Sequence, residues 1–172
     1  IPHVAVGNCN YNTRQIINLI KQAEEKGVEI VCFPELCITA YTCQDLFEST
    51  LLLDKAIENI YNIIEATKHS DIISIVGAPI KINTYLANCA IVIQQGKILG
   101  IVPKTYLPNY KEFYEKRWFA SSDEIPNSII AITQIIFFIP ILLFYKCINY
   151  TTTNFLYRVV TFFFQFSFLI LQ

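Results

Sequence analysis

The chain has 172 residues, which is enough for one domain with a hydrophobic core and too few for two ordinary ones. Its 13 basic and 14 acidic residues give a formal net charge of −1, so no basic surface is expected to attract the phosphates of a nucleic acid. All 14 acidic residues precede residue 128, and only Lys146 and Arg158 carry charge beyond it. We therefore divide the sequence into residues 1–128, with the composition of an ordinary α/β protein, and an aberrant hydrophobic tail, 129–172.

The N-terminal part predicts a strand, a helix and a second strand. The segment "HVAVGN" at 3–8 favours a short strand. The segment "NTRQIINLIKQAEEK" at 12–26 places its apolar residues on one helical face, and Asn12 or Thr13 is the expected N-cap. The β-branched run "VEIVCF" at 28–33 is typical of a buried strand. This order is the beginning of an α/β layer.

A second helix is expected over residues 46–68. Ile57, Ile60, Tyr61 and Ile64 recur on one side of this segment, so we predict that they form its buried face.

Three buried strands should follow the second helix. The run "DIISIVGAPI" at 71–80 predicts the first strand. The segment "ANCAIVIQQGKILGIVPK" at 87–104 predicts two more, joined by a turn at Gln95–Gly96, because a short polar turn with glycine between apolar runs is a hairpin signal. The elements of residues 1–103 therefore read β-α-β-α-β-β-β.

The six cysteines are interpreted as reduced thiols. The sequence contains no CxxC pair, so neither a disulfide framework nor a metal site is predicted. Cys32 and Cys89 fall inside apolar strand-like runs, where a buried free cysteine is ordinary. The chain contains no methionine, so we expect the native N-terminus to lie upstream of Ile1.

Two charged residues occupy the positions where α/β proteins place their sites. Glu35 directly follows "IVCFP" and Lys104 directly follows "ILGIVP", so each lies at the carboxyl end of a predicted strand, after a proline that restricts the backbone. A carboxylate and an ammonium in one pocket supply a general base and a group that stabilises an oxyanion. The alternative from spacing alone is an ordinary salt bridge.

The segments "FPELCITAYTCQDLF", "VGAPI" and "NCAIVIQQGKILGIVPKTYLPNYKEFYEKRWF" resemble the carbon-nitrogen hydrolase (nitrilase) superfamily. The resemblance covers roughly residues 4–122 and is strongest to the N-terminal glutaminase domain of glutamine-dependent NAD synthetases. It implies an α/β fold of the nitrilase type, an α-β-β-α sandwich, which would be incomplete at the C-terminal side of this chain.

The resemblance also implies roles for individual residues. Glu35 would be the general base, Lys104 would stabilise the oxyanion, and Glu115 would be a second carboxylate that holds the lysine and the substrate. Tyr110 would line the glutamine pocket. The alternatives are a solvated charge at Glu115 and a packing residue at Tyr110. The nucleophilic cysteine of the family is unassigned, because Cys147 in "FYKCINY" lacks the acidic residue that follows it in the family.

The implied activity is hydrolysis of the glutamine side-chain amide through a thioester, which releases ammonia for glutamine-dependent NAD synthesis. No cofactor is expected for the glutaminase part, whereas ATP would be used by a synthetase domain that this chain lacks. Homo-oligomers and a cytoplasmic location are expected from the family. Without a nucleophile the chain alone is predicted to be inactive. The alternatives are another nitrilase-type amidase and a non-catalytic, truncated or membrane-tethered relic.

The hydrophobic tail has three interpretations. Two of its segments approach the length of about twenty apolar residues that spans a bilayer, which would give a membrane anchor. The second interpretation is a diverged core segment. We favour the third, in which the tail is not native coding sequence, since AT-rich DNA read out of frame yields such a composition.

Overall fold

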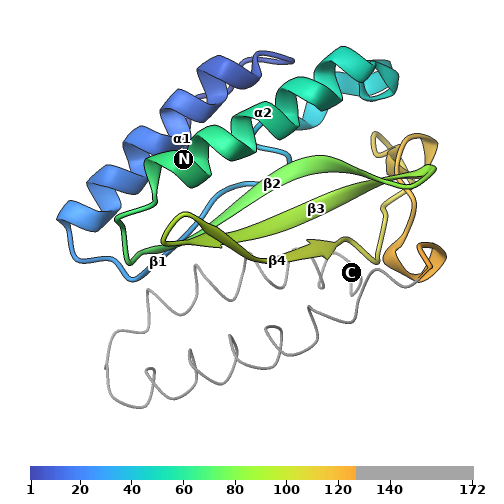
Figure 1. The fold of residues 1–172 in the computed structure, drawn as a ribbon. Coiled ribbons are helices and arrows are strands. Elements are labelled where there is room, and N and C mark those ends of the chain that lie inside the picture. The colour runs from blue at the N-terminus through green and yellow to red at the C-terminus, as the bar shows by residue number, and fades with distance from the viewer. Residues whose placement is uncertain (127–172) are drawn as a thin grey trace.

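Two long helices and a four-stranded sheet dominate residues 1–126, the part of the chain that the computed structural model describes. Both helices lie on one face of the sheet (Figure 1). The strands follow the order β1-β2-β3-β4, with β1 parallel to β2 and the other neighbours antiparallel. The elements are α1 (Cys9–Glu25), β1 (Ile30–Cys32), α2 (Thr50–Ala66), β2 (Ile73–Ile82), β3 (Tyr85–Gln94) and β4 (Lys97–Pro103), with short 3₁₀ helices η1 (Tyr41–Glu48), η2 (Glu115–Arg117) and η3 (Ser122–Glu124).

The main core lies between the helices and the sheet. Successive side chains of a strand point to opposite faces, so alternate residues such as Val76 and Ala78 of β2 and Cys89 and Ile91 of β3 belong to one buried cluster. The helices contribute Ile16, Ile20, Ala56, Ile60 and Ile63. The expected α/β architecture is therefore confirmed in the described residues.

The strand predicted at 3–8 is wrong. Residues 1–5 form no regular element, and residues 6–7 form a turn. The backbone of Ala5 is paired by a side chain instead of a strand, because Asn12 accepts the Ala5 N–H at 2.7 Å and donates to the Ala5 carbonyl at 2.9 Å. Asn12 is thus a buried partner of this segment, and the N-cap of α1 is Asn8.

The second helix exists, but its buried face was misassigned. Ile57 and Tyr61 are exposed, whereas the buried positions include Ala56, Asn59 and Ile60. Asn59 lies in the core because its amide donates to the Lys55 carbonyl and to the side chain of Asn10. A search for apolar periodicity does not count an asparagine as a buried residue, so it placed the buried face of this helix on the wrong side.

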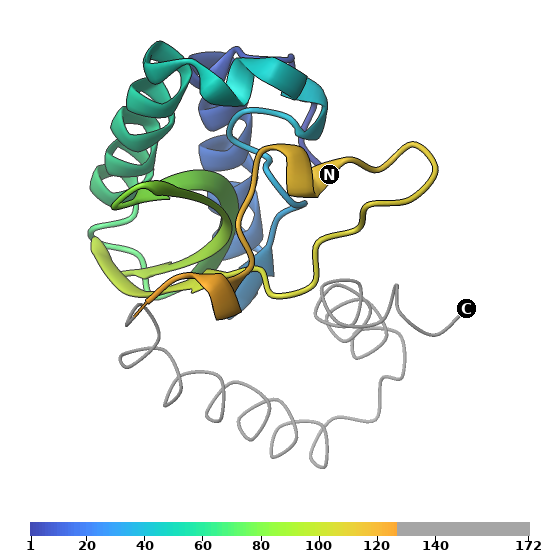
Figure 2. The same ribbon diagram turned by 90° about the vertical axis from the view of Figure 1, so that its right-hand side faces the viewer.

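The predicted hairpin is confirmed. β3 and β4 pair on either side of Gln95 and Gly96, which both have positive φ, as the two central residues of a type I′ turn require. After β4 the chain loops away from the body of the domain and returns as η2, which Figure 2 shows in yellow and orange. This loop is the segment "PKTYLPNYKEFYEKRWF".

Both apolar segments of the predicted tail, 129–172, lie outside the described residues. Across residues 1–126 neither helix combines the length and the apolar character that crossing a bilayer needs.

Candidate active site

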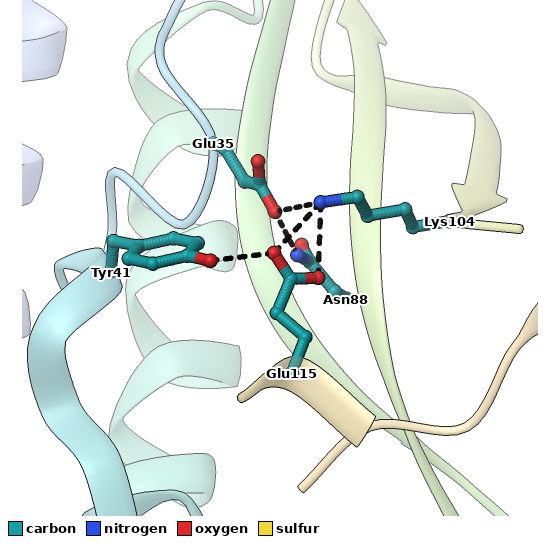
Figure 3. Close-up of polar contacts among 5 residues, drawn as sticks. All are labelled: Glu35, Tyr41, Asn88, Lys104 and Glu115. Carbon is teal, nitrogen blue, oxygen red and sulfur yellow. Dashed lines mark hydrogen bonds and ion pairs between the residues drawn. The ribbon is translucent and has the colours of Figure 1, made fainter. Parts of the chain in front are cut away.

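A buried lysine lies between two glutamates at one end of the sheet (Figure 3). The Nζ atom of Lys104 is 2.8 Å from Oε1 of Glu35, and it is 2.8 and 3.0 Å from the two carboxylate oxygens of Glu115. The side chains of Lys104 and Glu115 are only 6% and 3% exposed, whereas that of Glu35 is 25% exposed. The structure thus brings together the three residues that were predicted to be catalytic, and Glu35 is the one that solvent reaches.

Strand register explains why Glu35 and Lys104 meet. Lys104 continues β4 beyond Pro103, and its N–H donates to the carbonyl of Asn88 on β3 at 2.8 Å. Glu35 follows β1, which runs parallel to β2. β4 is antiparallel to β3, which is antiparallel to β2, so β4 runs in the same direction as β1 and β2. The segments after β1 and after β4 therefore emerge at the same end of the sheet.

A glycine lets the Glu35 segment approach the sheet. A Cβ atom on Gly77 of β2 would lie 2.4 Å from the Leu36 nitrogen and 3.0 Å from both the Glu35 carbonyl carbon and the Pro34 oxygen. All three contacts are to backbone atoms, which cannot rotate away as a side chain can. Leu36 itself has a φ of 50°, which is unusual for a residue with a side chain. The position of Glu35 is thus determined by a close backbone crossing over Gly77.

Asn88 is a fourth member of the cluster that sequence reasoning missed. It is fully buried, and its Nδ2 donates to Oε1 of Glu35, the oxygen that also accepts from Lys104. Its Oδ1 atom is buried and has no hydrogen-bond partner among residues 1–126. The available signal was an asparagine inside the otherwise apolar run "ANCAIVI", because a buried polar residue needs a partner.

Tyr41 is the fifth member and was also missed. Its hydroxyl donates to Oε1 of Glu115 at 2.7 Å, although the two residues are far apart in the sequence. Burial and the neighbouring Glu115 carboxylate raise the pKa of Tyr41. The phenol is therefore a protonated donor at neutral pH.

Burial, together with repulsion by Glu35, raises the pKa of Glu115, although hydrogen bonds from Lys104 and Tyr41 act in the opposite direction. With all three groups ionised, the two carboxylates and one ammonium carry a net charge of −1. The geometry is that of an ammonium held between two carboxylates, of which that of Glu35 is the more exposed.

Tyr110 lies outside the cluster. It is 46% exposed, and a row of aromatic rings connects it to Tyr41 of the cluster. Its ring centroid is 5.8 Å from that of Phe113, which is 6.4 Å from that of Tyr41, both edge to face. Its predicted role in the glutamine pocket stays a prediction.

None of the five cysteines in residues 1–126 has the features of an activated nucleophile. All are free thiols, and burial raises the pKa of each, to about 11 for Cys9 and about 12 for Cys32, Cys37 and Cys89. A reactive cysteine needs a lowered pKa. Cys147, the remaining cysteine, lies outside the described residues. Within those same residues, no group of three or more metal-ligating side chains could hold a metal ion.

The fold and the site define a class of α/β protein in which a carboxylate and a lysine meet at strand ends. The chain belongs to the carbon-nitrogen hydrolase family, whose profile matches residues 5–139. It is similar to the glutamine-dependent NAD(+) synthetase of Mycobacterium leprae, with 33% identity over 127 residues, which are 74% of this chain and 19% of that protein. The chain thus spans about a fifth of the length of the curated relatives it matches.

Solved structures agree with the sequence comparison. A glutamine-dependent NAD(+) synthetase from Cytophaga hutchinsonii aligns with a TM-score of 0.66 and 33% identity, covering 70% of this chain and 20% of that one. A carbon-nitrogen hydrolase from Helicobacter pylori G27 aligns with a TM-score of 0.61, covering 72% of this chain and 44% of that one, and at 24% identity it speaks for the fold alone. The fold predicted from the resemblance, α/β of the nitrilase type, is confirmed.

Proposed function

We propose that this chain carries part of a site that hydrolyses the side-chain amide of glutamine and releases ammonia for NAD synthesis. The observation that carries the proposal is the buried contact of Lys104 with Glu35 and Glu115. The similarity to glutamine-dependent NAD(+) synthetases supports glutamine as the substrate. Because the chain spans only a fifth of such proteins, the proposal concerns the amide-hydrolysing step.

In the proposed step, Glu35 acts as the general base. Its Oε1 accepts from Lys104 and Asn88, whereas Oε2 has no hydrogen bond within residues 1–126 and belongs to a partly exposed side chain. Oε2 would take the proton of a cysteine thiol as the sulfur attacks the amide carbon. The same proton passes to the leaving nitrogen, so ammonia departs and a thioester remains. Water then cleaves the thioester to give glutamate.

Lys104 has the complementary role. As the sulfur attacks, negative charge develops on the amide oxygen, and a buried ammonium stabilises that charge more strongly than an exposed one. Glu115 holds the ammonium in place with two hydrogen bonds.

The lack of an assigned nucleophile limits the reaction that the chain can carry out alone. The thiols of residues 1–126 have pKa values raised by burial or partial burial, and Cys147 lacks the sequence context of the family's nucleophile. We therefore expect the chain to bind glutamine and not to release ammonia.

The test measures binding and turnover separately on the full 172-residue chain. Glutamine binding is followed by calorimetry for the wild type, Lys104→Met, and the exposed control Lys97→Met. The expected result is binding that Lys104→Met weakens at least about tenfold, whereas Lys97→Met leaves it unchanged. A folded wild-type chain that does not bind glutamine would refute the proposal. Equal binding of a simple aliphatic amide would favour another amidase.

Ammonia release is measured in the same samples. We expect none above the uncatalysed background. Release that Cys147→Ala abolishes would identify Cys147 as the nucleophile and overturn the expectation of an inactive chain.

A further inference from the structure

Asp45 accepts three hydrogen bonds on the surface above the site. Its Oδ1 accepts from Nε of Arg117 at 2.8 Å and from the indole N–H of Trp118 at 3.0 Å, and its Oδ2 accepts from Nη2 of Arg117 at 3.3 Å. The side chains of Asp45 and Arg117 are 63% and 59% exposed. A two-pronged contact with a guanidinium fixes orientation as well as distance.

The same two segments meet a second time inside the site. Asp45 and Tyr41 both belong to η1, and Glu115 and Arg117 both belong to η2. The internal contact is the hydrogen bond from the Tyr41 hydroxyl to Glu115. The two segments are thus joined by an exposed contact and by a buried one, although η1 is kinked at Gln44, between Tyr41 and Asp45.

The backbone of η2 links the two contacts rigidly. The carbonyl of Glu115 accepts from the N–H groups of Trp118 at 3.0 Å and Phe119 at 2.9 Å, so a shift of this turn moves Glu115. Both aromatic rings pack on Phe47 of η1, with centroids 5.9 and 4.9 Å away. Ring packing is less directional than hydrogen bonding. The backbone of the turn is also bonded at its two ends, by the Glu115 N–H to the Pro108 carbonyl at 3.1 Å and by the Ala120 N–H to the Leu86 carbonyl at 2.8 Å. The Asp45 bonds act between these two points, on Arg117 and Trp118.

We propose that Asp45 is a positioning residue that, through Arg117 and Trp118, holds Glu115 against Tyr41 and Lys104. The residue touches no reacting group and acts only through the position of the turn. This role explains two parts of the sequence that catalysis does not use, "CQDLF" and "KRWF". It concerns the position of Glu115 and does not require turnover.

The test is a double-mutant cycle on unfolding of the full chain, with Asp45→Asn, Tyr41→Phe and the double variant. Within residues 1–126, no hydrogen bond or ring contact joins Asp45 and Tyr41 directly. If their roles were independent, their effects on the unfolding constant would multiply within about twofold. If Asp45 positions Glu115, the Tyr41 hydroxyl no longer contributes to stability once Asp45 is changed. The effect of the double variant on the unfolding constant should then be smaller than the product of the two single effects by about fivefold or more. A product within twofold would overturn the proposal.

Glu48→Gln is the matched control. Glu48 is exposed on the same segment and acts on Arg117 only through its charge. The effects of Glu48→Gln and Tyr41→Phe on the unfolding constant should multiply independently. Equal non-additivity for Glu48 would mean that general charge on η1, and not the Asp45 bonds, holds the turn.

A second readout follows Glu115 directly. Because burial is the main cause of its raised pKa, Asp45→Asn should bring the pKa of Glu115 back toward its ordinary value of 4.5, measured by carbon-13 NMR of the carboxyl groups with Glu115→Gln for assignment. An unchanged Glu115 pKa in a folded Asp45→Asn variant would also overturn the proposal. Both readouts work in a chain that does not bind glutamine, so failure of the proposed function is distinguishable from failure of this inference.

Discussion

Gly77→Ala should displace Glu35 without changing any residue of the site. The added Cβ would meet the Leu36 nitrogen at 2.4 Å, so the two backbones must separate by about 1 Å to reach ordinary contact. A shift of that size is enough to convert the 2.8 Å contact between Lys104 and Glu35 into a separation that is no longer a hydrogen bond.

The cost of this substitution can be estimated from packing alone. Gly77 lies in β2 and is not among the positive-φ glycines, so alanine is compatible with its backbone conformation. Overpacking of this kind typically costs about 1–3 kcal/mol, and we expect a loss of about 2 kcal/mol in the free energy of unfolding. Urea denaturation at neutral pH measures it.

The displacement at the site has its own assay. Acylation of lysines, followed by mass spectrometry of the peptides, should leave the buried Lys104 largely unmodified in the wild type and modify it faster in Gly77→Ala. The exposed Lys55 and Lys68 are internal standards for reagent activity.

Gly27→Ala is the matched control, because its surroundings are the reverse of those of Gly77. Gly27 has a φ of +68°, and no atom lies within 4 Å of the place that an added Cβ would occupy, so alanine there costs about 1 kcal/mol through the backbone alone. It should leave Lys104 protected. A Gly77→Ala chain as stable as the wild type, with Lys104 equally protected, would refute the view that the close crossing places Glu35.

Two further changes test the electrostatics of the cluster. Lys104→Met removes the cation that favours the ionised form of Glu115, so the pKa of Glu115 should rise further above 4.5. A carboxyl group with a raised pKa contributes full stability below its unfolded pKa and loses it as pH rises through its folded pKa, so urea midpoints of this variant should fall more steeply with rising pH above about 4.5 than those of the wild type. A parallel pH dependence would contradict this assignment. Asn88→Asp replaces the donor to Glu35 by a third carboxyl group of the same shape, and at pH 7 it should cost about 2–4 kcal/mol in unfolding free energy. The deficit should shrink toward pH 4, where the new group is protonated, and a pH-independent deficit would show that lost packing is the cause.

Part of the site can be predicted from the sequence because the ends of strands have a recognisable local pattern. An apolar run, a proline and then a charged residue mark both Glu35 and Lys104, and the resemblance to carbon-nitrogen hydrolases added Glu115. The structure brings these three together. Their meeting depends on the register of β1, β2 and β4, which the sequence pattern does not specify, so spacing alone could not separate a site from a surface salt bridge.

The rest of the site depends on long-range partners. Asn88 resembles any polar residue that interrupts a strand until Glu35 is placed above it. Tyr41 precedes Glu115 by 74 positions and follows a buried alanine with a φ of 75°, a backbone conformation that no propensity predicts. The same cause misled the helix prediction at Asn59. Polar side chains that are buried for the sake of one distant partner are invisible to methods based on apolar periodicity.

In the proposed step, the second carboxylate would bear on the charge of the cluster as Glu35 takes up a proton. With Glu35 ionised, its charge repels Glu115 and is one cause of the raised Glu115 pKa. When Glu35 takes up a proton in the proposed step, that repulsion disappears and the cluster changes from a net charge of −1 to a balanced pair of Lys104 and Glu115. Glu115 is then held in its ionised form by Lys104 and Tyr41 at the moment when negative charge develops on the amide oxygen. In the proposed step the ammonium would therefore stay anchored by Glu115 while its contact with Glu35 weakens, which would leave it able to turn toward the oxyanion.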